Sequence, residues 1–176
     1  MSVLTKPHRS PVTGNQPGSR ATPTPPERPI PADVRKVISA DRLLALTLAT
    51  VADLDRLPGW PPVRFPNPEG ATPGALMAML LYAYAAGWMG SDEIEEQARR
   101  DHQLAYLAAG QLPSSPTLRR FRRCFRPVVE EALADLLGRI AAAVPGAMPA
   151  RPAALEAEAR RRLDLAVMAD TIALDY

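Results

Sequence analysis

Hydrophobic side chains recur at helical spacing along most of the chain, beginning near residue 33. Between residues 33 and 57 they form a stripe with one member every three or four positions, and Pro58-Gly59 interrupts the pattern. The members of this stripe are Leu44, Leu48, Val51 and Leu54. The spacing predicts one or two amphipathic helices over residues 33–57.

The pattern changes twice in the next fifty residues. Residues 60–74 contain five prolines and two glycines, which interrupt helical hydrogen bonding and predict an ordered or semi-ordered connector. Residues 75–88 are apolar on nearly every side, which is typical of a central helix that other elements surround. Residues 91–109 predict a further helix, with Ser91 placed to cap its first turn.

Proline and serine positions divide the helices that follow. Leu112-Pro113 predicts a short turn, and Ser115-Pro116 predicts the start of a helix over residues 116–126. Pro127 predicts a bend or a restart, after which residues 128–144 form a second amphipathic piece. The expected buried positions of that piece are Val129, Leu133, Leu136, Leu137 and Ile140.

The C-terminal region predicts mixed structure. Residues 145–152 read as a connector, and residues 153–162 as a solvated helix with Glu and Arg four positions apart. Residues 163–176 mix Val, Ile and Leu with aspartates and predict a short strand. The expected fold class is therefore all-α, a helix-turn-helix-like bundle with a short C-terminal strand.

The first 32 residues are rich in Pro, Ser, Thr and Gly and contain few large apolar side chains. Such a segment cannot bury enough surface to offset the entropy of ordering, so it predicts a disordered tail. The expected organisation is a tail over residues 1–32, a helical domain over residues 33–144, and a linker with a further helix and strand over residues 145–176.

Composition narrows the classes of function. The 21 basic side chains nearly balance the 19 acidic ones, so only local clustering of charge can argue for a nucleic-acid partner. The one cysteine, Cys124, excludes an intramolecular disulfide and a cysteine-based zinc cluster, which suits a reducing cytosol. The sequence contains no apolar run of the roughly 20 residues that span a bilayer. We therefore expect a cytoplasmic protein without a membrane partner, cofactor or metal.

Residues 116–126 are the most informative segment. On a helix, Leu118, Phe121, Cys124 and Phe125 share a face that we expect to be buried. The opposite arc carries basic side chains without a single acid, namely Arg119, Arg120, Arg122, Arg123 and Arg126. Guanidinium groups suit phosphate oxygens and guanine edges, so this arc favours nucleic acid over a bland solvated surface, although an acidic protein partner also fits.

A helix, a short turn and an arginine-rich helix follow one another as in a helix-turn-helix. Residues 71–125, ATPGALMAMLLYAYAAGWMGSDEIEEQARRDHQLAYLAAGQLPSSPTLRRFRRCF, also resemble the InsH-like N-terminal domain of insertion-sequence DDE transposases. Looser similarity extends from Ser39 to about Ile140. The resemblance implies a helical domain that binds double-stranded DNA, with Phe121 in the core and with Thr117, Arg119, Arg122 and Arg123 as contacts.

The same resemblance bears on catalysis. In such transposases a ribonuclease-H-like domain follows, and residues 165–175, LAVMADTIALD, look like the start of its first strand. Asp170 is then the candidate first carboxylate of a metal site. Two-metal phosphoryl transfer needs several converging carboxylates, so we expect no complete catalytic centre in this chain.

Three hypotheses about function remain at this stage. The first is a truncated or domesticated transposase fragment that binds duplex DNA in the nucleoid. The second is a domesticated helical module for protein interaction that no longer binds DNA. The third is an active transposase completed by a separately encoded catalytic chain. A homo-oligomer and a second protein both remain open as partners.

Overall fold

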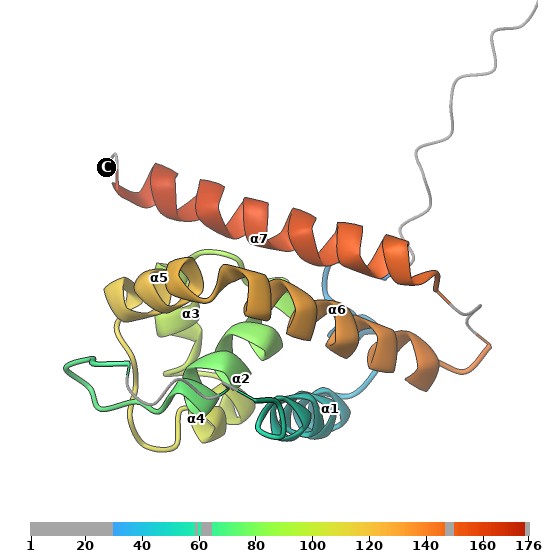
Figure 1. Ribbon diagram of the computed structural model, residues 1–176, viewed down its shortest axis with the longest axis horizontal. Coiled ribbons are helices and arrows are strands. Elements are labelled where there is room, and N and C mark those ends of the chain that lie inside the picture. Colours follow the sequence, from blue (N-terminus) through green and yellow to red (C-terminus); the bar gives the residue numbers. More distant parts are fainter. Residues whose placement is uncertain (1–29, 59, 61–64, 147–149, 175–176) are drawn as a thin grey trace, which may run out of the picture.

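The computed structural model describes residues 30–58, 60, 65–146 and 150–174, and every regular element in these residues is helical (Figure 1). The elements are the 3₁₀ helix η1 (Val34–Lys36) and the α-helices α1 (Ala40–Leu54), α2 (Pro73–Ala85), α3 (Ser91–Gln97), α4 (His102–Leu107), α5 (Ser115–Cys124), α6 (Arg126–Ala143) and α7 (Pro152–Leu174). The expected all-α bundle is confirmed. The disorder expected for residues 1–29 lies outside the described residues.

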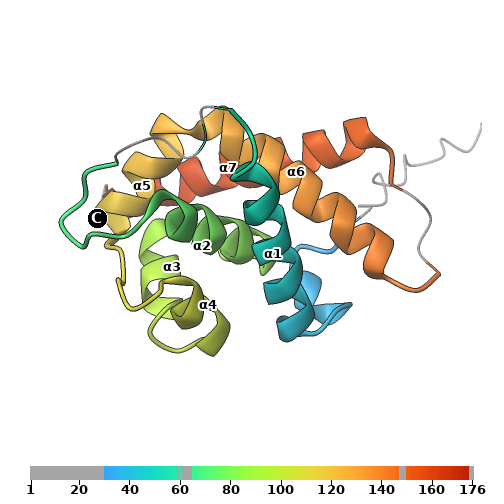
Figure 2. The same ribbon diagram turned by 60° about the horizontal axis from the view of Figure 1, so that its bottom comes forward.

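Helix α2 is the centre of the bundle, as its apolar pattern predicts. Thr72 caps the helix by accepting a hydrogen bond from the Ala75 N–H, and Pro73 occupies its first turn. All ten residues from 76 to 85 are buried. Helices α1, α4, α5 and α6 pack around α2 (Figure 2), so its lack of a polar face is a consequence of contacts on several sides.

Helix α7 corrects two expectations for the C-terminal region. The strand expected over residues 163–176 is wrong, because a single helix runs from Pro152 to Leu174 along α6 (Figure 1). The first half of this helix is also not simply solvated, because Ala159, Arg162 and Leu163 are buried. Their spacing continues through Ala166 on one face of the helix. The β-branched residues that suggested a strand, such as Val167 and Ile172, are exposed outside this buried face.

The boundary of the N-terminal tail is also corrected. Ile30 is only 1% exposed and belongs to the core, and the carbonyl oxygens of Pro31 and Ala32 accept hydrogen bonds from Arg162 of α7. The buried side chain of Ile30 and the hydrogen-bonded carbonyl groups of Pro31 and Ala32 therefore hold residues 30–32 on the helical domain, whereas the sequence placed them in the tail.

The single helix expected over residues 91–109 is two helices, α3 and α4. The break falls at Asp101, whose carboxylate caps α4 by accepting a hydrogen bond from the Leu104 N–H. Ser91 is not a cap either, because Gly90 occupies the N-cap position of α3 and the Ser91 hydroxyl points elsewhere.

An aromatic cluster anchors α5 to the core. Phe121 is 0% exposed and its ring packs edge-on against Phe65 and Trp60, at centroid distances of 5.2 and 6.3 Å. The burial expected for Phe121 is confirmed. Cys124, which the same helical face placed inside, is exposed. Cys124 is the last residue of α5 and lies about 120° around the helix from Leu118, at the edge of the buried face.

We predict that Phe121→Ala lowers the free energy of unfolding by about 3 kcal/mol, because the cavity loses both transfer energy and ring contacts. Urea denaturation followed by circular dichroism measures the loss. Cys124→Ala on the same helix is the control, with an expected change within about 0.5 kcal/mol. Equal stabilities of the two variants would contradict the assignment of the buried face.

Candidate nucleic-acid interface

The start of α5 is held by carboxylates from two other parts of the chain. The Ser115 N–H donates to Glu95 Oε2 of α3 at 2.7 Å, and the Ser114 N–H donates to Glu69 Oε1 at 3.1 Å. Burial raises the pKa of Glu69, but hydrogen bonds from Ser114 and Thr117 outweigh it and hold the pKa below its usual range. These carboxylates take the place that an external anion would occupy at the positive end of the helix.

Thr117 is therefore not available as a DNA contact. Its side chain is buried, and its hydroxyl donates to Glu69 Oε2 at 2.9 Å. The DNA-binding role that the resemblance implies for Thr117 is corrected, because the residue fixes the loop before α2 against the first turn of α5.

Arg122 departs most from the expected arc of arginines. It is 5% exposed, its Nη2 donates to Asp170 Oδ2 of α7, and its Nη1 donates to the Tyr84 hydroxyl at 3.1 Å. Burial raises the pKa of Tyr84 to about 12, against the opposing charge of Arg122, so the phenol stays protonated. Arg122 contacts the core of the protein rather than its surface, which corrects its expected place as a DNA contact.

Asp170 completes this buried network from α7. Besides Arg122, its carboxylate accepts hydrogen bonds from the Ser91 N–H at 2.7 Å and from the Ser91 hydroxyl at 2.8 Å. Both oxygens are thus occupied by protein donors, and the carboxylate neutralises the start of α3. In the described parts of the chain no three His, Cys, Asp or Glu side chains are grouped so that they could hold a metal ion. The structure gives Asp170 a structural contact in place of the metal-binding role considered for it.

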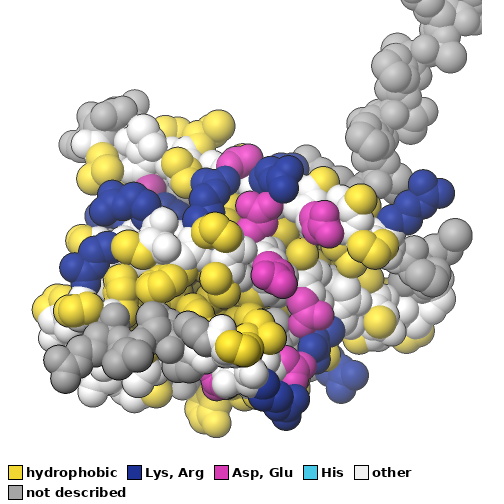
Figure 3. Space-filling view, in the orientation of Figure 1, with side chains coloured by type: hydrophobic (Ala, Val, Ile, Leu, Met, Phe, Trp, Pro, Cys, Tyr) yellow, Lys and Arg dark blue, Asp and Glu magenta, His cyan; other side chains and the backbone are white. Residues whose placement is uncertain are grey.

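The other four arginines of the segment keep their guanidinium groups at the surface. Arg123 is exposed and has no ion pair with any described residue, while Arg120 is exposed and lies over the Phe65 ring at 4.7 Å. Arg119 and Arg126 are partly buried and pair with Asp92 at 3.6 Å and Asp164 at 2.5 Å. Figure 3 shows dark blue side chains gathered at the left of the molecule, over α5 and beside α7.

A cavity of about 270 Å³ separates α5 from the C-terminal turns of α7. Four arginines of the segment line it from one side, and apolar and polar residues of α7 line it from the other. The lining residues are Arg119, Arg122, Arg123, Arg126, Val167, Asp170, Thr171 and Leu174.

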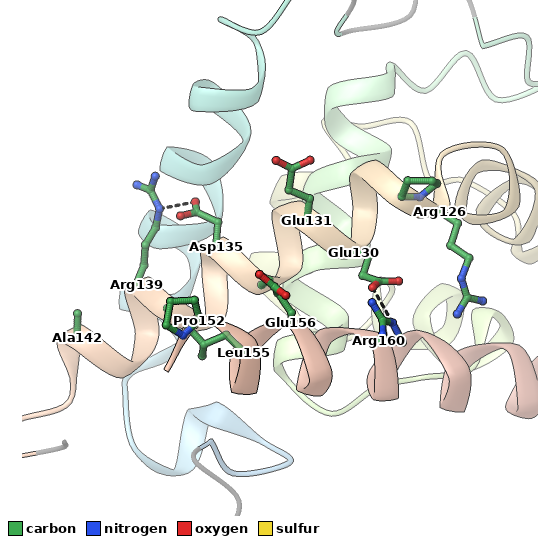
Figure 4. Close-up of a pocket in the computed structure, with 13 residues that line it drawn as sticks. Arg126, Glu130, Glu131, Asp135, Arg139, Ala142, Pro152, Leu155, Glu156 and Arg160 are labelled. Carbon is green, nitrogen blue, oxygen red and sulfur yellow. Dashed lines mark hydrogen bonds and ion pairs between the residues drawn. The ribbon is translucent and has the colours of Figure 1, made fainter. Parts of the chain in front are cut away.

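A larger groove of about 880 Å³ lies between α6 and α7 (Figure 4). Its walls carry carboxylates and guanidinium groups around a partly apolar floor that includes Ala134, Gly138 and Leu155. Two ion pairs cross or border it, Arg160 with Glu130 at 2.9 Å and Arg139 with Asp135 at 2.7 Å. Mixed charge distinguishes this groove from the arginine-lined cavity.

Arg162 is a buried, structurally important residue that the sequence pattern did not identify. It is 0% exposed, pairs with Glu158 at 2.8 Å, and donates to the carbonyl oxygens of Tyr84 and Ala85 at 2.5 and 3.2 Å. A cation at this position donates hydrogen bonds to carbonyl groups at the negative end of α2. The four-residue spacing of Glu158 and Arg162 predicted the pair but not its burial.

No family model, no curated protein and no solved structure matches this chain. Among the helices that the structure describes, none is both long and apolar enough to cross a membrane. The function is therefore inferred from the contacts of α5 and α7 themselves.

We predict that Asp170→Asn lowers the free energy of unfolding by about 3 kcal/mol, because it leaves the buried Arg122 charge uncompensated. Asp164→Asn is the matched control on the same helix, since it removes the exposed partner of Arg126 and is expected to cost less than about 1 kcal/mol. Urea denaturation of both variants measures the difference. A small and equal loss in the two variants would contradict the buried ion pair.

Proposed function

We propose that this chain is a DNA-binding module that contacts duplex DNA through α5 and the first residue of α6. The observation that supports the proposal best is the surface of residues 115–126. This segment contains no acid, and four of its arginines keep their guanidinium groups accessible. They are Arg119, Arg120, Arg123 and Arg126. We refer to these four residues as the arginine surface.

The chemistry of guanidinium groups supports phosphate and base-edge contacts. They stay charged at any physiological pH and donate paired hydrogen bonds that fit phosphate oxygens and the O6 and N7 atoms of guanine. Residues 108–114 connect α4 to α5, and α5 packs against α3 rather than α4, so α3 and α5 are the helices that correspond to a helix-turn-helix pair. A ten-residue helix is about 15 Å long, which is enough to lie in a major groove.

Two aspartates pair with residues of the arginine surface, and a DNA phosphate has to displace them or bind beside them. The side chains of Asp92 and Asp164 are 54% and 61% exposed. Ion pairs at such exposed positions contribute at most about 1 kcal/mol, so phosphate groups can exchange with them at little cost. The partners of Arg119 and Arg126 are therefore compatible with DNA binding.

The resemblance of the sequence to the N-terminal domain of insertion-sequence transposases is a second ground for the proposal. The resemblance covers residues 71–125, which correspond to α2, α3, α4 and α5 with Phe121 inside. We propose DNA binding by this part of the chain alone, and association with the nucleoid is a consequence of that binding.

The test is duplex binding by the double variant Arg120→Gln/Arg123→Gln over a series of salt concentrations. If each arginine neutralises one phosphate, the slope of log affinity against log salt becomes less steep by about 1.8. Arg122 is kept, because its removal would disturb the buried pair with Asp170. The matched control is Arg56→Gln/Arg160→Gln, which removes two other exposed arginines.

Fluorescence anisotropy with a labelled duplex gives the affinities, and circular dichroism checks that helical content is preserved. A wild-type chain that is folded but shows no salt-sensitive binding would overturn the proposal. An equal loss in the control variant would also overturn it, because the effect would then come from total charge rather than from the arginine surface.

A second candidate function is a helical module for protein interaction. The groove between α6 and α7 favours it, because a partly apolar floor bordered by charges of both signs suits a peptide or helix (Figure 4). Helix α7 also carries exposed apolar side chains, such as Met168 and Ile172, which a partner protein could cover. Absence of salt-sensitive DNA binding by the folded chain would favour this candidate.

A further inference from the structure

The cavity between α5 and α7 gathers cationic groups at one small site. Arg119 and Arg123 lie one turn apart on α5, Arg126 begins α6, and all three line the cavity that faces α7. Across the cavity, α7 contributes Val167 and Leu174 as apolar walls. The cavity is therefore a recess in the arginine surface rather than part of an even charged face.

Charge inside the cavity is not balanced. Arg122 and Asp170 neutralise one another, and the two Asp170 oxygens are already engaged by Arg122 and Ser91. Asp170 is the one acid among the residues that line the cavity. Because Arg122 and Ser91 already engage its oxygens, Asp170 does not neutralise the other guanidinium groups. Arg123 has no ion pair with any residue that the structure describes. Arg119 and Arg126 pair with Asp92 and Asp164, which do not line the cavity, so Arg123 is the arginine of this site whose charge no described acid neutralises.

The volume suits a small anion. About 270 Å³ corresponds to roughly nine water molecules, since each occupies about 30 Å³ in the liquid. A tetrahedral phosphate group with a few waters fits this space, whereas the body of a duplex does not. The Thr171 hydroxyl donates its hydrogen bond to the Val167 carbonyl oxygen at 2.9 Å, so it does not donate to an anion in the cavity.

We propose that this cavity is a binding site for a single phosphate group, held by Arg123 with Arg119 and Arg126 on either side. Planar guanidinium groups donate paired hydrogen bonds to phosphate, which favours this ion over chloride. The exposed partners Asp92 and Asp164 exchange for the ligand at little cost. The phosphate comes either from solution or from a nucleic-acid backbone, so the site extends beyond duplex binding and does not depend on it.

The first experiment titrates the full chain with inorganic phosphate by isothermal calorimetry, with sodium chloride at matched ionic strength as the reference. We expect a saturable heat of binding with phosphate and none with chloride. Arg123→Gln should weaken phosphate binding by about tenfold, the loss expected for one charge-assisted contact. Arg56→Gln is the matched control, because this exposed arginine lies after α1, outside both the cavity and the arginine surface, and the affinity of this variant should stay within about twofold of wild type.

The absence of saturable phosphate binding by the folded wild-type chain would overturn this inference. An Arg56→Gln variant that loses as much affinity as Arg123→Gln would overturn it as well, since that result indicates general surface charge.

A second experiment measures binding of a labelled duplex at increasing concentrations of inorganic phosphate. It distinguishes a site for free phosphate from a site for a backbone phosphate of the duplex. Competition beyond that of matched chloride supports the cavity as the place where a backbone phosphate enters. Phosphate binding by a chain that does not bind the duplex supports the cavity with free phosphate as its ligand and overturns the proposed function alone. Duplex binding by a chain that shows no phosphate binding overturns the cavity site alone.

Discussion

The fold depends on two guanidinium groups that are buried and therefore need partners inside the protein. Helix α7 supplies these partners for both. Asp170 neutralises Arg122 of α5 and caps α3, while Arg162 pairs with Glu158 and reaches the carbonyl groups at the end of α2 and before η1. Because the contacts of α7 join segments more than seventy residues apart in sequence, this helix is part of the domain and not an appendage.

This constraint divides the arginines of α5 into two kinds. Arg122 is committed to the interior by Asp170 and Tyr84, whereas Arg120 and Arg123 remain exposed and Arg119 and Arg126 border a cavity. The buried ion pair holds α7 beside the arginine surface and thereby forms one wall of that cavity. Arg122 thus serves the fold, and the proposed phosphate and DNA contacts fall on the four residues of the arginine surface.

The sequence pattern correctly predicted those features that depend on residues close together in the chain. The apolar character of α2, the restart at Pro127 and the burial of Phe121 all follow from spacing and proline chemistry. Two failures arise from long-range pairing. Arg122 lies beside the apolar face on a helical wheel, and only the approach of Asp170 from α7 decides that it is buried. Residues 163–174 contain β-branched side chains typical of a strand, but packing against α6 and α3 selects a helix.

The division between buried and exposed arginines can be observed directly by nuclear magnetic resonance of the arginine side-chain Nε–H groups during titration with a DNA duplex. The account predicts that the signals of Arg120 and Arg123 shift in a saturable, salt-sensitive manner. The signals of Arg122 and Arg162 should stay unshifted and exchange slowly with solvent, since both groups are buried and paired. An Arg122 signal that shifts with DNA as strongly as that of Arg123 would contradict the account, because Asp170 would then not hold this residue inside the fold.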